Sequence, residues 1–195
     1  MDLIATLGRT LGFSFAAGVN LYATVAILGL ASRYEWVTLP PQFKAFDNDI
    51  VIGVAAVMYV VEFVADKVPW LDSAWDLVHT IIRPIGGAVI AVTTLGDASP
   101  TVEGLVALLG GAVAASSHLT KTSTRAVANT SPEPFSNWGL SLGEDLFVVG
   151  LGYLALQYPV AALVVASVLL VVIVAFAAVI VRTVRRWFQR PHALL

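Results

Sequence analysis

The sequence predicts an all-α integral membrane protein, a polytopic bundle of about six transmembrane helices. Two observations predict this class: 58% of the 195 residues are hydrophobic and only 12% are charged, and the apolar residues form long runs between polar turns. A soluble domain carries roughly 25% charged residues. The composition therefore excludes disorder, most soluble folds and a nucleic-acid partner, and it predicts the lipid bilayer as the main partner.

The chain has no cysteine, so disulfides, thiol catalysis and thiolate metal sites are excluded. No cofactor is predicted. Asp2 precedes the first apolar run and Arg9 lies inside it, unlike the positive start and short apolar core of a secretory signal. We therefore expect this segment to be a membrane helix of the mature chain.

A transmembrane helix needs roughly 20 mostly apolar residues. The first four predicted spans cover residues 11–32, 49–66, 77–96 and 102–128. Asn20 is the one interruption of the first span, and the turn at 96–100 separates the third span from the fourth.

The last apolar stretch covers the 36 residues from 146 to 181. It is too long for one helix across about 30 Å, and too short for two full spans and a turn. We therefore expect the fifth span to begin near Ser141, which brings Glu144 and Asp145 to the membrane edge. The sixth span covers residues 160–181.

The distribution of Lys and Arg predicts the orientation. The tail carries Arg182, Arg185, Arg186 and Arg190, which the positive-inside rule places in the cytoplasm. Six spans would put both termini there, together with nine of the eleven Lys and Arg residues.

Two short matches indicate an internal repeat. AAGVNLYAT (16–24) and AASSHLTKT (114–122) share Ala, Ala, Leu and Thr at equal offsets and align Asn20 with His118, and T-x-P-x-x-F occurs at 38–43 and 130–135. Three spans per half give opposite orientations. We therefore expect one membrane domain (1–195) built as a 3+3 inverted repeat, with halves 1–97 and 98–195, as in many secondary transporters. Duplication kept only for packing is the alternative.

Ionisable residues at membrane depth are costly and are functional candidates. Glu62 and Asp66 share one helix face near the inner end of the second span, and Lys67 follows. The alternative for this first cluster is a solvated helix end.

A second cluster, with spacings of 4, 3 and 4, lies on one helix face and consists of Asp72, Asp76, His79 and Arg83. Two carboxylates and an imidazole could bind a divalent cation. Because Arg83 can pair with Asp76 or His79 instead, no metal site is predicted.

A third cluster lies on one face of the fourth span and consists of His118, Lys121, Arg125 and Asn129. With hydroxyls such as Thr122, it suits an anion or a phosphorylated group. The alternative is that Lys121 and Arg125 pair with Glu144 and Asp145 of the fifth span.

The repeat places Asn20 and His118 face to face across its interface. We therefore predict a substrate site formed by Asn20, His118, Lys121, Arg125 and Thr122. Small residues allow helices to pack closely, but Gly12-Phe13 and Gly110-Gly111 could instead mark breaks in the first and fourth helices.

Three stretches carry a family resemblance: GFSFAAGVNLYATVAILGL (12–30), VEFVADKVPWLDSAWDLVHT (61–80) and KTSTRAVANTSPEPFSNWGLSLGED (121–145). In these the chain resembles the small bacterial membrane proteins grouped as domain of unknown function 4126. The resemblance implies a six-helix fold in the bacterial cytoplasmic membrane, with no established activity and no catalytic residues to transfer.

Three functions remain open. The leading hypothesis is a transporter or channel for a small solute or ion, with His118 or Glu62 as candidates for proton coupling. The second is a membrane enzyme or lipid-handling protein at the inner leaflet, although no catalytic motif is found. The third is a scaffold whose charges only form salt bridges. The identity of the solute and assembly into a homo-oligomer are left open.

Overall fold

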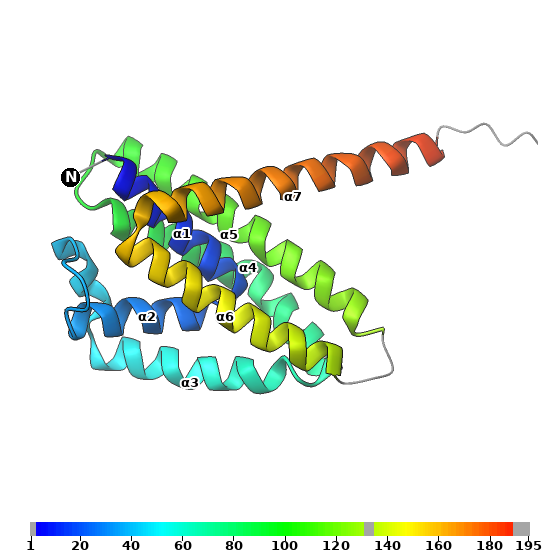
Figure 1. The fold of residues 1–195 in the computed structure, drawn as a ribbon, viewed down its shortest axis with the longest axis horizontal. Helices are drawn as coiled ribbons and strands as arrows, with labels where there is room; N and C mark the ends of the chain where they lie inside the picture. The colour runs from blue at the N-terminus through cyan, green and yellow to red at the C-terminus, as the bar shows by residue number, and fades with distance from the viewer. Residues whose placement is uncertain (1–2, 131–134, 189–195) are drawn as a thin grey trace, which may run out of the picture.

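The computed structural model describes residues 3–130 and 135–188, which contain helices and no strand. In chain order these are α1 (Leu3–Val19), α2 (Leu21–Arg33), the 3-10 helix η1 (Pro41–Phe46), α3 (Asp49–Ala65), α4 (Pro69–Leu95), α5 (Pro100–Ala128), α6 (Phe135–Gln157) and α7 (Pro159–Phe188). The predicted all-α class is confirmed. Figure 1 shows the helices running mostly between two ends of the molecule.

Four helices, α4 to α7, are long and apolar enough to cross a membrane. Their outer surfaces are apolar: Leu77 is 74% exposed and Leu108 is 73% exposed, whereas Arg83 is fully buried. Apolar side chains outside and charged side chains inside are the arrangement that a hydrocarbon environment favours. The chain is an integral membrane protein.

The prediction of one continuous helix over residues 11–32 is wrong. The helix breaks at Asn20, whose extended backbone (φ −148°, ψ 101°) separates α1 from α2. The Asn20 side chain accepts a hydrogen bond from the Ala23 amide and so caps α2, a position that Asn favours. The glycine pairs considered as break points lie within continuous helices, Gly12-Phe13 in α1 and Gly110-Gly111 in α5.

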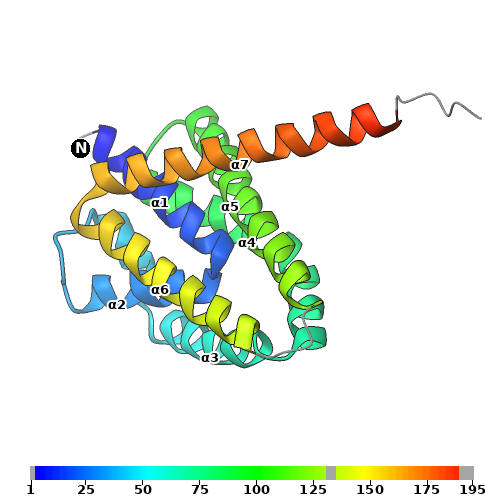
Figure 2. The same ribbon diagram turned by 45° about the vertical axis from the view of Figure 1, so that its right-hand side comes forward.

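This break turns the first span into a hairpin. In Figure 1 and Figure 2, α1 runs from one end into the centre of the bundle, and α2 returns toward the end from which α1 started. Gly8 of α1 packs on the backbone of Pro159, where α7 begins. α7 then runs to the opposite end, so α1 begins and α7 finishes at opposite ends of the bundle (Figure 1).

The break at Asn20 allows a second arrangement beside the expected six crossings with both termini on one side, and the number of crossings stays a prediction. An uninterrupted apolar run is compatible with a single span or with a hairpin that stays in the membrane. Hydropathy alone does not separate these two cases, because both keep the same residues away from water.

The 3+3 repeat is not visible in the helices that should correspond. Residues 16–24 contain the break, whereas the aligned residues 114–122 continue without interruption in α5. Most of the second T-x-P-x-x-F loop (131–134) lies outside the described residues. α1 is the central helix, with eleven buried residues in its 17, while α5 keeps a large lipid-facing side.

Small residues allow the close crossings around α1 and between α4 and α5. Gly18 packs on the backbone of Ala114, and Gly87 and Gly110 bring α4 and α5 together. Aromatic pairs fill the space beside α1, including Phe15 and Phe147 with ring centroids 5.8 Å apart. These contacts fix the positions of the polar side chains further along the same helices.

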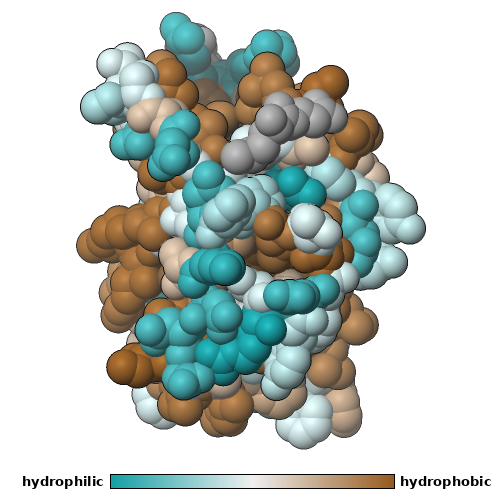
Figure 3. All heavy atoms as spheres, turned by 90° about the vertical axis from the view of Figure 1, so that its left-hand side faces the viewer, coloured by the Kyte–Doolittle hydropathy of each residue, from teal (hydrophilic) through white to brown (hydrophobic). Residues whose placement is uncertain are grey.

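Figure 3 shows the end of the molecule at the left of Figure 1. Hydrophilic residues gather over this end, while apolar surface flanks it on both sides. The pattern matches a polar end face above a lipid-facing belt.

Candidate functional site: a buried charge network

The three polar clusters come together in one place. Glu144 and Asp145 of α6 join them. We define the charge network as the following side chains: Glu62, Asp66, Asp72, Asp76, His79, Arg83, His118, Lys121, Arg125, Glu144 and Asp145. These side chains come from α3 and its C-cap and from α4, α5 and α6. All are buried except Glu144 and Asp145, which are half-buried.

Arg83 links α4 to three other helices. Its Nη2 donates to Glu62 Oε1 at 2.7 Å, and its Nη1 donates to the Gly18 carbonyl at 3.1 Å. The same Nη1 lies 2.8 Å from His118 Nδ1. Because a guanidinium has no acceptor, His118 Nδ1 must accept and the neutral ring carries its proton on Nε2. Protonating Nδ1 would set two cations against each other, which argues against His118 as a proton carrier.

His79 contacts one carbonyl and one hydroxyl. Its Nδ1 donates to the Trp75 carbonyl at 2.7 Å, and its Nε2 lies 2.9 Å from the Tyr22 hydroxyl, which donates to it when the ring is neutral. The ring stacks on Trp75 with centroids 4.6 Å apart. Among the described residues, no three His, Cys, Asp or Glu side chains converge as metal ligands.

Lys121 lies among three carboxylates. Its Nζ is 3.1 Å from Glu62, 3.3 Å from Asp66 and 3.4 Å from Glu144. The side chain is only 2% exposed. The three carboxylates account for the three N–H donors of the Lys121 ammonium, which leaves none for a ligand from outside the network.

Arg125 forms a fork-like pair with Glu144. Nε donates to Glu144 Oε1 at 3.0 Å, and Nη2 donates to Oε2. Nη2 also donates to Asp66 Oδ2 and Nη1 to the Asp66 carbonyl, both at 2.8 Å. The pairing expected between Glu144 and the cations of α5 is therefore present.

Asp145 does not join that pairing. It accepts from Asn20 Nδ2 at 3.2 Å and from the Tyr59 hydroxyl. Within the described residues it forms no ion pair, although the sequence suggested Lys121 or Arg125 as its partner. Asp145 instead connects α6 to the break between α1 and α2.

Asn20 and His118, predicted to face each other, have different hydrogen-bond partners in the described residues. Asn20 bonds to Ala23 and Asp145, whereas His118 lies against Arg83 and close to Thr80. Thr122 donates to the Leu119 carbonyl at the edge of the network. The structure thus brings Lys121 and Arg125 onto the same carboxylates, Asp66 and Glu144, whereas Asn20 and Thr122 bond to other groups.

Sequence reasoning missed two contributors to this region. Tyr59 lies three residues before Glu62, on the same face of α3, and helical spacing could have identified it. The Gly18 carbonyl is a main-chain acceptor, and only the break at Asn20 explains why it is available to Arg83.

The charges of this region do not balance. Lys67 adds a fourth cation beside the network, where its Nζ donates to Ser141 Oγ at 3.4 Å. Within the described residues, six carboxylates therefore face four cations, and two negative charges are left uncompensated while the histidines are neutral. Four carboxylate oxygens are buried without a hydrogen bond: Glu62 Oε2, Asp66 Oδ1, Asp72 Oδ1 and Asp76 Oδ1.

Two cavities border the charge network. One of about 290 Å³ is an apolar groove between α1, α5 and α6, with Lys121 and Glu144 among its lining residues. The other, of about 220 Å³, is lined mostly by polar residues and lies between the start of α4 and the end of α5.

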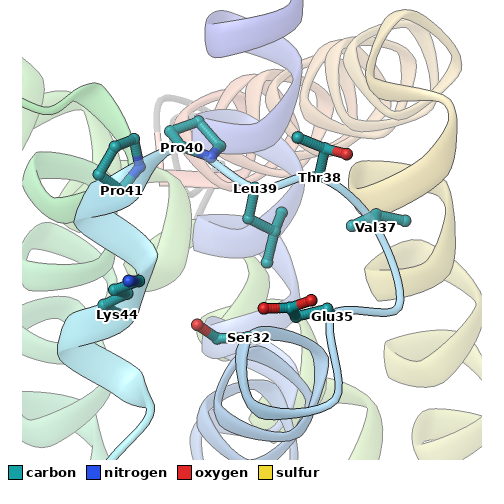
Figure 4. A pocket seen from close by; sticks show the side chains of 8 residues that line it. All are labelled: Ser32, Glu35, Val37, Thr38, Leu39, Pro40, Pro41 and Lys44. Atoms are coloured by element: carbon teal, nitrogen blue, oxygen red, sulfur yellow. The ribbon is translucent and has the colours of Figure 1, made fainter.

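A third cavity of about 320 Å³ lies apart from the network, between the end of α2 and η1. Figure 4 shows Ser32 and Glu35 on one side of it, Lys44 on η1, and Leu39 projecting between them.

Comparison with known proteins gives one family. No curated protein and no solved structure matches the chain. The family model described as "Domain of unknown function (DUF4126)" matches residues 7–179. The chain belongs to this family.

Proposed function

We propose that this DUF4126 family member is a small membrane transporter for a positively charged solute or ion, located in the bacterial cytoplasmic membrane. The observation that carries the proposal is the excess of buried carboxylates around a broken helix. Uncompensated charge in a membrane protein is expensive, and it marks ion pathways and proton relays. A cation arriving from outside the protein would supply the missing charge.

The break at Asn20 supports transport. Non-helical backbone at membrane depth is tolerated where it is buried in protein or lines a cavity. In transporters with discontinuous helices, unwound carbonyls and the C-terminal ends of half-helices face cations. Here the C-terminal end of α1 presents the Gly18 carbonyl to Arg83, so the negative end of the α1 dipole points at positive charge.

The same contacts argue against an anionic substrate. Lys121 and Arg125, which the sequence suggested for an anion, have their charges matched by Glu62, Asp66 and Glu144. An anion would have to displace carboxylates already held at 2.5 to 3.4 Å. Among the predicted substrate residues, we propose Asn20 as the hinge of the α1–α2 hairpin.

Flux through proteoliposomes tests the proposal. Purified protein is reconstituted, and uptake of protons, monovalent cations, divalent cations and small anions is compared. We expect cation or proton flux that Glu62→Gln reduces at least about tenfold, since the substitution removes a fully buried charge from the network. Glu103→Gln, at the start of α5 outside the network, should retain the flux. Flux of anions alone, or equal flux in both variants, would contradict the proposal.

A second candidate function is favoured by one observation. The groove between α1, α5 and α6 is mainly apolar and has Lys121 and Glu144 along it. This combination of an apolar wall and a charged edge suits lipid handling. Lipid transfer between vesicles that survives Glu62→Gln and is lost on filling the groove with Gly143→Leu would favour this function over transport.

A further inference from the structure

We infer that the polar cavity between α4 and α5 binds one hydrated divalent cation. This inference rests on the proposed function and specifies the ligand that it acts on. The cavity borders the charge network, and its polar lining consists of Asp72, Ser73, Asp76, Thr80, Thr122, Arg125 and Asn129. The Arg125 guanidinium donates to Asp66 and Glu144. Oxygen atoms of carboxylates, amides and hydroxyls are the ligands that Mg²⁺ and Ca²⁺ prefer.

The lining contains buried oxygens that lack hydrogen bonds. They are Asp72 Oδ1, Asp76 Oδ1 and Asn129 Oδ1. Asp76 is the extreme case, because it is only 5% exposed and none of the hydrogen bonds in the described residues reaches its carboxylate. A buried carboxylate without a donor is costly unless a cation accompanies it.

The neighbouring arginines do not donate hydrogen bonds to these carboxylate oxygens. Arg83 Nη1 is 3.8 Å from Asp76 Oδ1, but this nitrogen already contacts Gly18 and His118. Arg125 Nη1 is 3.6 Å from Asp72 Oδ1, but it donates to the Asp66 carbonyl. Both distances exceed those of a hydrogen bond.

The size of the charge deficit points to a divalent ion. Asp72 and Asp76 both line this cavity, and no arginine nitrogen lies within hydrogen-bond distance of their Oδ1 atoms. A single divalent cation would balance them. The alternative is two protons, which would need no cavity.

The volume indicates that the ion keeps its water. A cavity of about 220 Å³ has room for about seven waters at about 30 Å³ each. Two carboxylates and one amide oxygen do not complete a coordination sphere, but Mg²⁺ commonly keeps several waters and is held by one or two carboxylates. Thr80 and Thr122 can accept hydrogen bonds from those waters.

Mn²⁺ serves as the probe, since its free form is measured by electron paramagnetic resonance. The full chain in detergent is titrated with Mn²⁺ at constant pH, and Mg²⁺ is added as a competitor. We expect saturable binding of one Mn²⁺ per chain that Mg²⁺ displaces. Asp76→Asn should raise the Mn²⁺ dissociation constant at least about tenfold, because the loss of even an outer-shell partner commonly costs 10–100-fold. Asp97→Asn, in the exposed turn between α4 and α5, is the matched control.

A second variant protects the test against a folding failure. Asn129 Nδ2 donates to Asp72 Oδ2 at 2.8 Å. Asn129→Asp replaces that donor by a carboxylate, so the metal-free protein should melt at a lower temperature than the wild type. Mn²⁺ or Mg²⁺ should restore the loss, and the Mn²⁺ affinity should increase. A purely structural role for Asn129 predicts a loss that neither metal restores.

The outcomes separate this inference from the proposed function. Absence of saturable Mn²⁺ binding, or equal affinity in Asp76→Asn and Asp97→Asn, overturns the divalent site; cation flux in proteoliposomes would still support transport. Saturable, Asp76-dependent binding without flux supports the site and contradicts transport.

Discussion

Glu144 and Asp145 are adjacent in the sequence but have opposite electrostatic surroundings. Glu144 contacts the cations Lys121 and Arg125, whereas Asp145 contacts the neutral donors Asn20 and Tyr59. The residues of the network could be identified from the sequence because charge is rare at membrane depth. Their pairing could not be predicted, since it depends on the rotation of α6 against α5, and one step along a helix turns a side chain by about 100°.

This difference predicts unequal stability effects. Glu144→Gln leaves Arg125 buried without its bidentate partner, so we expect a loss of roughly 3 kcal/mol, the lower range for breaking a buried pair because Glu144 is 15% exposed. Asp145→Asn removes no ion pair and also lowers the excess negative charge, so its loss should be smaller. Thermal melting in detergent compares the two variants. Equal losses would show that Asp145 depends on a cation after all.

Glu35 follows α2 in the left-handed conformation, with φ of 48°. The Trp36 amide donates to the Ala31 carbonyl, which is the bond that closes a helix with a left-handed residue. Glycine adopts this conformation without strain. Glu35→Gly should therefore increase the free energy of unfolding by about 1 kcal/mol and raise the melting temperature. Glu35→Ala should not raise it. No gain for glycine would indicate that the Glu35 side chain stabilises the cavity shown in Figure 4.

The α1–α2 hairpin is the element that most changes the interpretation of the chain. Charge and turn signals predicted α3 and α5 to within two residues, whereas α4 begins eight residues and α6 six residues before the predicted starts. The hairpin was missed because its one signal, Asn20, is a single polar residue in a long apolar run. Asn is common both as a helix cap and as a buried polar residue within a span, and only tertiary contacts distinguish the two.

Asn20 has two roles at this element, which substitutions can separate. Its oxygen caps α2 and its nitrogen donates to Asp145. Asn20→Asp keeps a capping oxygen but sets two carboxylates together, whereas Asn20→Ala removes both interactions. Loss of the cap alone costs about 0.5–2 kcal/mol. We expect Asn20→Asp to melt below the wild type, and combining it with Asp145→Asn to recover most of the loss, because the repulsion is then removed. No recovery in the double variant would show that Asp145 does not act through Asn20.

At the scale of the whole molecule, a hairpin that does not cross the membrane would change the side on which the chain begins. α3 and α5 finish toward the same end of the bundle as α7, whereas α1 begins at the other end (Figure 1). Lys67 follows α3, Arg125 is in the last turn of α5, and Arg185 and Arg186 are in the last turn of α7. The positive-inside rule then puts the end of α7 in the cytoplasm and the start of α1 outside. Six crossings would instead put the start of α1 inside.

Single cysteines in this cysteine-free chain decide between the two topologies. Ala45→Cys in η1 and Thr130→Cys after α5 are references at opposite ends, and both positions are exposed. With a hairpin, Leu3→Cys should react with a membrane-impermeant maleimide in intact cells, as Ala45→Cys does, while Thr130→Cys should react only after the membrane is opened. If Leu3→Cys instead reacts only after the membrane is opened, as Thr130→Cys does, the first apolar run crosses the membrane. The hairpin at Asn20 would then be wrong.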